Sequence, residues 1–337
     1  MPTMSQDSVR VLPMHSRSAM TLAEIRDAMS GMQPSLDGFK GGWASTDNYE
    51  SNLRQVGVAP PRSKPVIEPA TDVLPEMLKA RFYFWDPSPS GFKDQNEVDP
   101  LLTRKLNAVD VIVTEPSTGR IGLLFSTRTR SYLNQRFGAI ASLNRILQSA
   151  DPTIRIEKGE SHLRLSDEEI FLWLAVQHRD QPQLAEDLVL DMISGVSSRD
   201  GASRTADLRC GVDFERSNFL TAVAEVDTLG PIDISFVHYV GDDNHSYEVK
   251  LHVDGGFEIR KNGLHFPDQL NRADVMLETS LFLAYSLIPR FNRLYVEDAT
   301  NWKGRRIEVI RDAMTALEER YKALKSVLQS QLELVTE

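Results

Sequence analysis

The amino-acid sequence predicts an α+β fold, with antiparallel sheets built from hairpins and meanders, helices packed against them, and a long amphipathic helix at the C-terminal end. Two observations predict this class. Stretches rich in β-branched residues follow one another with turn sequences between them, as in AVDVIVTEPSTGRIGLLFS at 108–126, which is typical of hairpins. Helical patterns gather beside these stretches instead of alternating with single strands, which favours α+β over a parallel βαβ arrangement.

The N-terminal segment, residues 1–75, reads as a flexible proline-rich tail or linker. It holds eight of the seventeen prolines of the chain, a composition that disfavours a packed core. Within it, Thr21 and Glu24 have the spacing of a capping box. A short amphipathic helix is therefore expected, docked either on the protein itself or on a protein partner. Its apolar stripe consists of Leu22, Ile25, Met29 and Met32.

Residues 76–150 are expected to form a small unit in which a strand and a hairpin are closed by a helix. Ser126 or Thr127 is expected to cap this helix, which runs from about 128 to 149. One helix face carries apolar residues at helical spacing. The expected strands lie at 79–85, 108–115 and 120–126, and the apolar helix residues are Leu133, Phe137, Ile140 and Leu147.

Residues 151–337 are expected to form a larger α+β domain. A capping box of Ser166 and Glu169 predicts the start of its first helix. Turns rich in Gly and Asp separate three successive strands. In order, the expected elements are a hairpin at 154–165, a helix through 170–178, a strand at 186–196, a helix at 214–226, strands at 233–240, 247–253 and 256–262, and helices at 268–290 and 303–333.

The composition narrows the classes of function. No apolar run approaches the roughly 18 residues that span a bilayer, so no membrane partner is expected. The N-terminus lacks the pattern of a secretory signal, and the single cysteine, Cys210, favours a reducing, cytoplasmic location and excludes a thiolate zinc site. Neither a resident metal nor a cofactor is predicted. The net charge of −10 disfavours general coating of nucleic acid but allows a local basic site.

An arginine-rich window is the main electrostatic anomaly. Between Pro116 and Ala150 the chain holds five arginines and no carboxylate, where about five carboxylates would be expected. Arg128 and Arg130 fall in the first turn of the predicted helix, where the dipole disfavours each cation by a few tenths to about 1 kcal/mol. An external anion such as a phosphate would resolve this conflict. Ion pairs with the protein's own acids and an acidic protein partner are alternatives. The candidate anion-binding residues are Arg120, Arg128, Arg130 and Arg136, and Arg145 completes the window.

A second basic cluster, NWKGRRIEV, comprises Lys303, Arg305 and Arg306 at the predicted start of the last helix, again at the end where the helix dipole disfavours cations. Tyr132 and the neighbouring Trp302 have rings on which bases could stack, although aromatic residues of this kind also serve as core packing. Together the two clusters favour a non-enzymatic subunit that binds nucleic acid, DNA or RNA, or another polyanion.

The last predicted helix carries an assembly signal. Its apolar residues are spaced 3, 4, 3, 4, 3 and 4 apart, which is the a/d pattern of a helix packed on another helix. The partner is either a second copy of the chain, giving a homodimer or larger oligomer, or the helix at 268–290 folded back. The seam consists of Ile307, Ile310, Met314, Leu317, Tyr321, Leu324 and Leu328.

Two other classes of function compete with this hypothesis. In a metal-dependent nuclease, Asp242 and Glu248 would hold Mg²⁺ and Lys250 would support the attacking water, but strand alternation gives Glu248 and Lys250 the pattern of a solvated sheet face. His238, His245 and His252 lack a carboxylate pair that would complete a metal site. The third class is a protein-recruiting scaffold without nucleic-acid contact, in which the arginines are paired internally.

Overall fold

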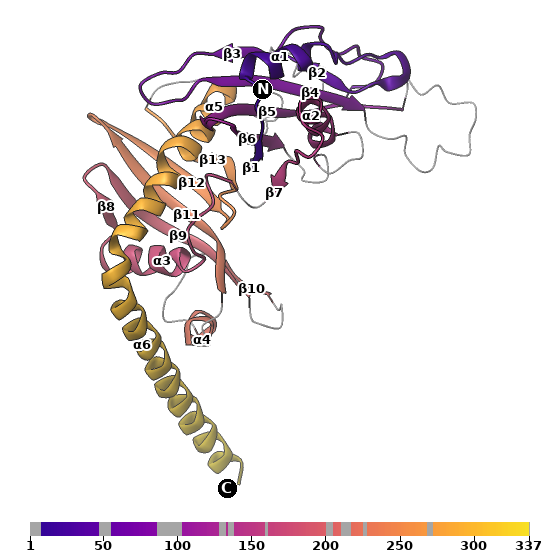
Figure 1. Cartoon of the computed structure of the whole chain (residues 1–337). Helices are drawn as coiled ribbons and strands as arrows, with labels where there is room; N and C mark the ends of the chain where they lie inside the picture. The colour runs from indigo at the N-terminus through magenta and orange to yellow at the C-terminus, as the bar shows by residue number, and fades with distance from the viewer. Residues whose placement is uncertain are drawn as a thin grey trace. The chain divides into compact units, whose positions relative to one another are not determined.

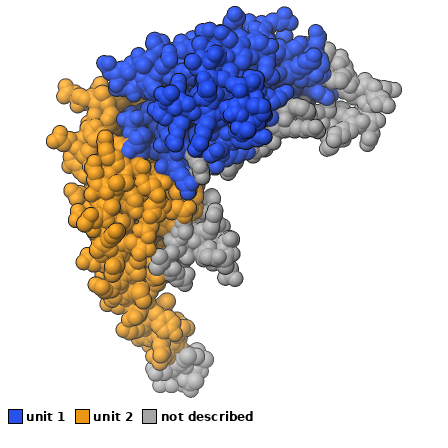
Figure 2. Space-filling view, in the orientation of Figure 1, with its two compact units in different colours: residues 1–164, 254–262, 268–289 blue, residues 165–253, 263–267, 290–337 orange. Residues whose placement is uncertain are grey.

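The structure is a computed structural model of the protein. It describes residues 8–46, 55–85, 103–127, 133, 138–158, 161–199, 205–209, 217–224, 228–267 and 272–336. The described residues form large antiparallel sheets and several helices, including a long C-terminal helix (Figure 1). These elements confirm the α+β class. The chain divides into two compact units, coloured separately in Figure 2. Unit 1 consists of 1–164, 254–262 and 268–289, and unit 2 of 165–253, 263–267 and 290–337.

Unit 1 is built on an antiparallel sheet whose neighbouring strands come from distant parts of the sequence. The strand order is β13 (Phe257–His265), β1 (Ser8–Arg17), β6 (Arg120–Thr127), β5 (Leu106–Ser117), β4 (Met77–Trp85) and β2 (Gly42–Ala44). Two short strands pair outside this order, β3 (Val66–Glu68) with β4 and β7 (Glu157–Lys158) with β1.

Two helices of unit 1 cover one face of this sheet. Figure 1 shows α1 (Leu22–Ser30) and α2 (Ala139–Gln148), which pack into one apolar cluster with β1, β4, β5 and β6. Inside it, Trp43 Nε1 donates a 2.9 Å hydrogen bond to Ser142 Oγ. Phe39, at the end of the short 3₁₀ turn Asp37–Phe39, and Trp85 pack on the other face. Because both faces are covered, every residue of β4 is buried.

Residues 8–46 are part of the folded core, so the expected loose tail is wrong for this part of the chain. β1 lies between β6 and β13, and Val9, Val11 and Leu12 are at most 4% exposed. The proline content concealed a strand whose partners are about 110 and 250 residues further along the chain. The short helix expected near Thr21 is confirmed as α1, with both capping-box bonds present. Its apolar stripe packs on unit 1 itself, which takes up the surface considered for a protein partner.

The helix expected from 128 begins later among the described residues. Ser126 and Thr127 are buried residues at the end of β6 rather than helix caps. α2 begins at Ala139, and its N-cap is Gly138. Extended pairing of β6 with β1 continues through Thr127, and these ladder bonds prevent Ser126 and Thr127 from starting a helix.

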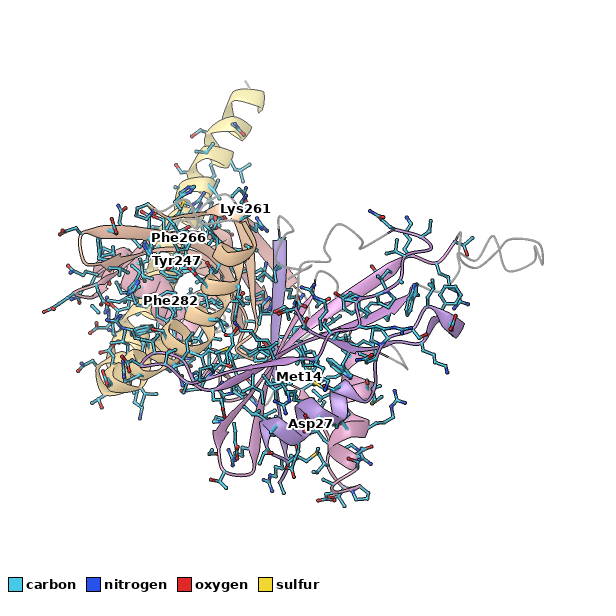
Figure 3. The ribbon with its side chains drawn as sticks, turned by 90° about the horizontal axis from the view of Figure 1, so that it is seen from above. Met14, Asp27, Tyr247, Lys261, Phe266 and Phe282 are labelled. Atoms are coloured by element: carbon cyan, nitrogen blue, oxygen red, sulfur yellow. The ribbon has the colours of Figure 1, made fainter. Side chains whose placement is uncertain are left out.

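Unit 2 contains its own antiparallel strands and helices. The strand order is β10 (Thr205–Arg209), β9 (Leu188–Arg199), β11 (Thr228–Val240) and β12 (Asp243–Leu251), and β8 (Gln183–Ala185) pairs with β9. Its helices are α3 (Ile170–Asp180), α4 (Ser217–Ala224) and α6 (Ile288–Thr336). Inward residues of β11 and β12 stack in its core, where the rings of Phe236 and Tyr247 lie 4.8 Å apart. Tyr247 also meets Phe266 edge-on (Figure 3).

Two local expectations around 154–170 are wrong. Instead of a hairpin, the described residues contain only the two-residue strand β7. The capping box of Ser166 and Glu169 does not form, because Ser166 is bonded to the Asn292 side chain and Glu169 itself is the N-cap without a side-chain bond. A long-range contact has replaced the local one.

The turn expected between 290 and 303 is absent, since α6 continues as one helix of 49 residues (Figure 1). It follows α5 (Arg272–Phe282) and a π-helical turn, Leu283–Leu287. The helical residues run without a break from Arg272 to Thr336, so Pro289 lies inside a continuous helix, where it removes a backbone hydrogen bond. The π-helical turn Leu283–Leu287 just before it is the kind of irregularity found where a helix contains a proline. In the described part of the chain, no helix is both long enough and apolar enough to cross a membrane.

Candidate anion-binding site

The residues of the arginine-rich window do not all fall in the described structure. Arg128, Arg130, Tyr132 and Arg136 lie outside the described residues, as does Cys210. Arg120 is described and exposed at the first position of β6. It lies seven residues from Thr127, at the opposite end of the strand, which corresponds to about 23 Å.

Arg120 lines a cavity of about 390 Å³ in unit 1. Residues from β1, β5, β6, β7 and the loop after β7 build this cationic pocket, which brings three arginines and two histidines together. Glu157 is the single carboxylate among the lining residues. The lining consists of His15, Arg17, Pro116, Arg120, Ile121, Glu157, Ser161, His162 and Arg164.

Strand register explains how two of the arginines meet. Arg17 of β1 lies directly opposite Arg120 of β6 in the antiparallel ladder. Side chains directly opposite each other project from the same face, and like charges in such a pair destabilise a sheet. Both residues are exposed, and neither has an ion pair to a carboxylate among the residues that the structure describes. The fold therefore concentrates positive charge here without neutralising it.

The remaining carboxylate is already engaged. His15 lies opposite Glu157 in the pairing of β1 with β7, and its Nε2 is 3.3 Å from Glu157 Oε2. Arg17 and Arg120 add two permanent positive charges to the pocket, because arginine stays protonated at neutral pH.

Gly122 makes room for His162. It lies opposite His15 in the ladder, and a Cβ at this position would come 2.9 Å from Thr114 Oγ1 and 3.1 Å from the His162 ring. The other side of that ring stacks on Tyr285, with 6.2 Å between ring centroids. Tyr285 in turn donates a 3.5 Å hydrogen bond to Thr114 Oγ1. The ring is thus fixed between sheet and helix while the residue remains open to solvent at the pocket.

Burial affects the titration of both rings in this stack. Partial desolvation lowers the pKa of His162, and the nearby His15 lowers it further. Desolvation raises the pKa of Tyr285 despite its hydrogen bond to Thr114. At neutral pH His162 is therefore a neutral hydrogen-bonding group beside permanently charged arginines.

The second basic cluster has a different environment. Trp302 is 2% exposed and belongs to the core of unit 2, so base stacking does not use this ring. Arg305 is 2.6 Å from Asp180 Oδ2, and Arg306 is 2.8 Å from Glu169 Oε1. Lys303 is exposed. Hydrogen bonds from Arg179 and Arg305 lower the pKa of Asp180 to about 2.

The expected conflict of this cluster with a helix dipole is wrong. Lys303 lies 15 residues beyond the start of α6 at Ile288, and the dipole effect is confined to the first and last turns. Arg305 and Arg306 are thus neutralised by carboxylates of α3 and its N-cap instead of being placed at a positive helix end.

The residues considered for metal-dependent cleavage do not converge. Asp242 lies in the turn before β12, six residues and about 20 Å of extended chain from Glu248. Lys250 Nζ is instead 3.3 Å from Asp233 Oδ2 on β11. His238 faces His245 across the same hairpin, and its Nε2 is 3.3 Å from Asp187. Across the described ranges, no group of three or more His, Cys, Asp or Glu side chains could hold a metal ion.

Comparison of the chain with protein-family models gives no match, and no curated protein matches its sequence. The site is therefore interpreted from its own geometry. Sequence reasoning identified Arg120 but missed His15, Arg17, His162 and Arg164, because these residues come from a strand hidden in the proline-rich segment and from a loop near 161–164.

Proposed function

We propose that this chain is a non-enzymatic subunit that binds a polyanion, DNA or RNA, by taking a phosphate into the cationic pocket. The observation that carries the proposal is the direct opposition of Arg17 and Arg120 without a carboxylate partner in the described part of the chain. Placing these two like charges opposite each other carries a cost in electrostatic free energy. A bound phosphate would remove it, since guanidinium groups donate two parallel hydrogen bonds to phosphate oxygens.

The other pocket residues support a phosphate ligand. The pocket volume of about 390 Å³ lies within the range of about 300–1,000 Å³ that is usual for ligand sites. His162 adds a ring N–H that could donate a hydrogen bond to a phosphate oxygen or a sugar. Such contacts reach the phosphates and sugars of a nucleic acid and not its bases, so we expect binding with little preference for nucleotide sequence. The predicted contribution of Arg128, Arg130, Tyr132 and Arg136 is kept as part of this proposal.

A titration with labelled oligonucleotides tests the proposal. Fluorescence polarisation with single-stranded and duplex DNA and with RNA, at about 50 and 200 mM salt, should detect binding that weakens as salt increases. The double variant Arg17→Ala/Arg120→Ala should bind at least about tenfold more weakly. The slope of log K against log salt should fall by up to about 2, because about one counterion is released per lost phosphate contact.

A matched variant separates the pocket from total charge. Arg62 and Lys64 are exposed cations of unit 1 that do not line the cationic pocket, and the double variant Arg62→Ala/Lys64→Ala removes the same two charges. It should retain wild-type affinity. Absence of salt-sensitive binding by the wild-type protein, or equal loss in both double variants, would reject the proposal.

We also propose that the subunit acts as a homo-oligomer through the seam of α6. The proposal is supported by the exposure of seam residues such as Met314, Tyr321 and Leu328, which are 53%, 70% and 58% exposed. Exposed apolar residues at heptad spacing favour helix–helix association. Linking two cationic pockets in one assembly would raise the avidity for a polyanion that spans both.

A further inference from the structure

The last part of α6 is an apolar surface that the described chain does not cover. As far as Ala313, α6 packs on unit 2, with Trp302, Val309 and Ala313 buried. From Glu318 to Gln331 every residue is exposed. Of the thirteen large hydrophobic side chains that are exposed in the described structure, six lie between Ile307 and Leu328. Such a concentration indicates an interaction surface rather than scattered surface residues.

Among the described residues, neither of the amphipathic elements that could cover this surface does so. The 268–290 region cannot fold back on the seam through a turn at 290–303, because α6 is helical throughout that range. The other amphipathic candidate, α1, has its stripe in the core of unit 1. A second copy of the chain is the occupant whose own sequence carries the same 3.5-residue pattern.

Heptad positions define which residues would meet. With Ile307 assigned to position a, the following a residues are Met314, Tyr321 and Leu328, and the d residues include Leu317 and Leu324. Glu318 and Lys325 then occupy successive e positions, and Arg320 and Val327 occupy g positions. The e and g residues flank the seam and determine the orientation of the paired helices.

A parallel pair of helices would place like charges together. In that orientation each g residue faces the e residue of the next heptad on the other helix, so Arg320 would face Lys325 of the second copy, twice per dimer. The two Tyr321 rings would also meet in the same layer. Both features disfavour the parallel orientation.

An antiparallel pair places opposite charges together. With Tyr321 packed against Leu324 of the second copy and Leu317 against its Leu328, the e positions face each other. Glu318 then meets Lys325 of the second copy, again twice per dimer. Arg320 meets Val327, over which its aliphatic stem can lie. The overlap covers residues 314–331, about 26 Å of helix.

We propose that two copies of the chain pair antiparallel through residues 314–331 of α6, with Glu318 of each copy bonded to Lys325 of the other. This inference rests on the proposed self-association and adds its orientation and register. Charge exchange tests it by sedimentation equilibrium of the full chain at low salt. Glu318→Lys and Lys325→Glu should each weaken the dimer about tenfold, because two attractive pairs become repulsive. The double variant, which restores opposite charges, should recover wild-type association.

The same variants distinguish the orientations. In a parallel dimer Lys325→Glu would tighten association, because it would face Arg320. That result would overturn the antiparallel inference while keeping self-association. A monomeric wild-type chain at high micromolar concentration would overturn both. Unchanged dissociation constants in both single variants would overturn the proposed register.

Disulfide trapping gives an independent measurement. In a Cys210→Ser background, Met314→Cys and Gln331→Cys chains should cross-link with each other when mixed and oxidised. Met314→Cys alone should not, because its two copies would lie about 26 Å apart along the paired helices. Cross-linking of Met314→Cys alone would indicate a parallel pair, and absence of the mixed cross-link in a dimeric sample would reject the register.

Discussion

Two pairs of arginines, one pair in each unit, have opposite environments. In unit 2, Arg305 and Arg306 each lie within 2.8 Å of a carboxylate from α3 or its N-cap. In unit 1, Arg17 and Arg120 face one another with no such partner among the described residues. The difference arises from acids about 125 residues away in the chain, so a cluster of cations becomes a candidate binding site only when the fold withholds carboxylates from it.

The largest expected effect concerns Arg81, a buried arginine of unit 1 that is paired with a buried carboxylate. Arg81 and Asp110 are both 0% exposed, and Arg81 Nε is 2.7 Å from Asp110 Oδ1. Arg81→Ala leaves a buried carboxylate without this cation, so we expect a loss of about 3–5 kcal/mol in the free energy of unfolding. Urea unfolding monitored by circular dichroism measures it.

A second variant identifies the cause of that loss. Replacing both partners by apolar residues of similar size, as in Arg81→Met/Asp110→Leu, should recover most of the lost stability. If the double variant were as unstable as Arg81→Ala, packing rather than charge compensation would explain the effect. An unchanged midpoint for Arg81→Ala would contradict the role given to the pair.

Local sequence signals predicted the elements that depend on local bonds. The capping box at Thr21 and Glu24 forms as expected, and the hairpin of β5 and β6 follows its turn sequence. Alternation along β12 also predicted that Tyr247, Val249 and Leu251 point inward. In these cases the stabilising partners are neighbours in the sequence.

The cationic pocket could not be predicted, because it is formed by residues that are far apart in the sequence and that no local pattern identifies. Arg17 meets Arg120 only because β1 pairs with β6, although Pro13 and the surrounding composition indicated a linker. Ser166 likewise gave up its predicted cap for a bond to Asn292. The predicted helix dipole conflict at Arg305 disappeared once α6 proved continuous. Tertiary contacts decided each of these outcomes.

Arg305→Ala has a smaller expected effect, and its result could contradict the contrast between paired and unpaired arginines. Arg305 and Asp180 are partly exposed, so Arg305→Ala should cost only about 0.2–1 kcal/mol of stability. Affinity for oligonucleotides should stay within about twofold of wild type, because this guanidinium already has a carboxylate partner. A loss of affinity as large as that of Arg17→Ala/Arg120→Ala would show that internal pairing does not separate structural from binding arginines.

The smallest effect concerns His162, where pH can add charge to the cationic pocket. Its pKa in the free protein lies below the usual 6.5, because burial and His15 both disfavour protonation. A phosphate among the arginines favours the protonated ring, so affinity should rise about two- to threefold as pH falls from about 7.5 to 5.5. Phosphodiesters stay ionised over this range, which assigns the change to the protein.

The variant His162→Gln, in which His15, Glu157 and the arginines are retained, should lose the part of that rise that is due to His162 while keeping its affinity at the higher pH. An identical pH profile in both proteins would place His162 outside the binding equilibrium.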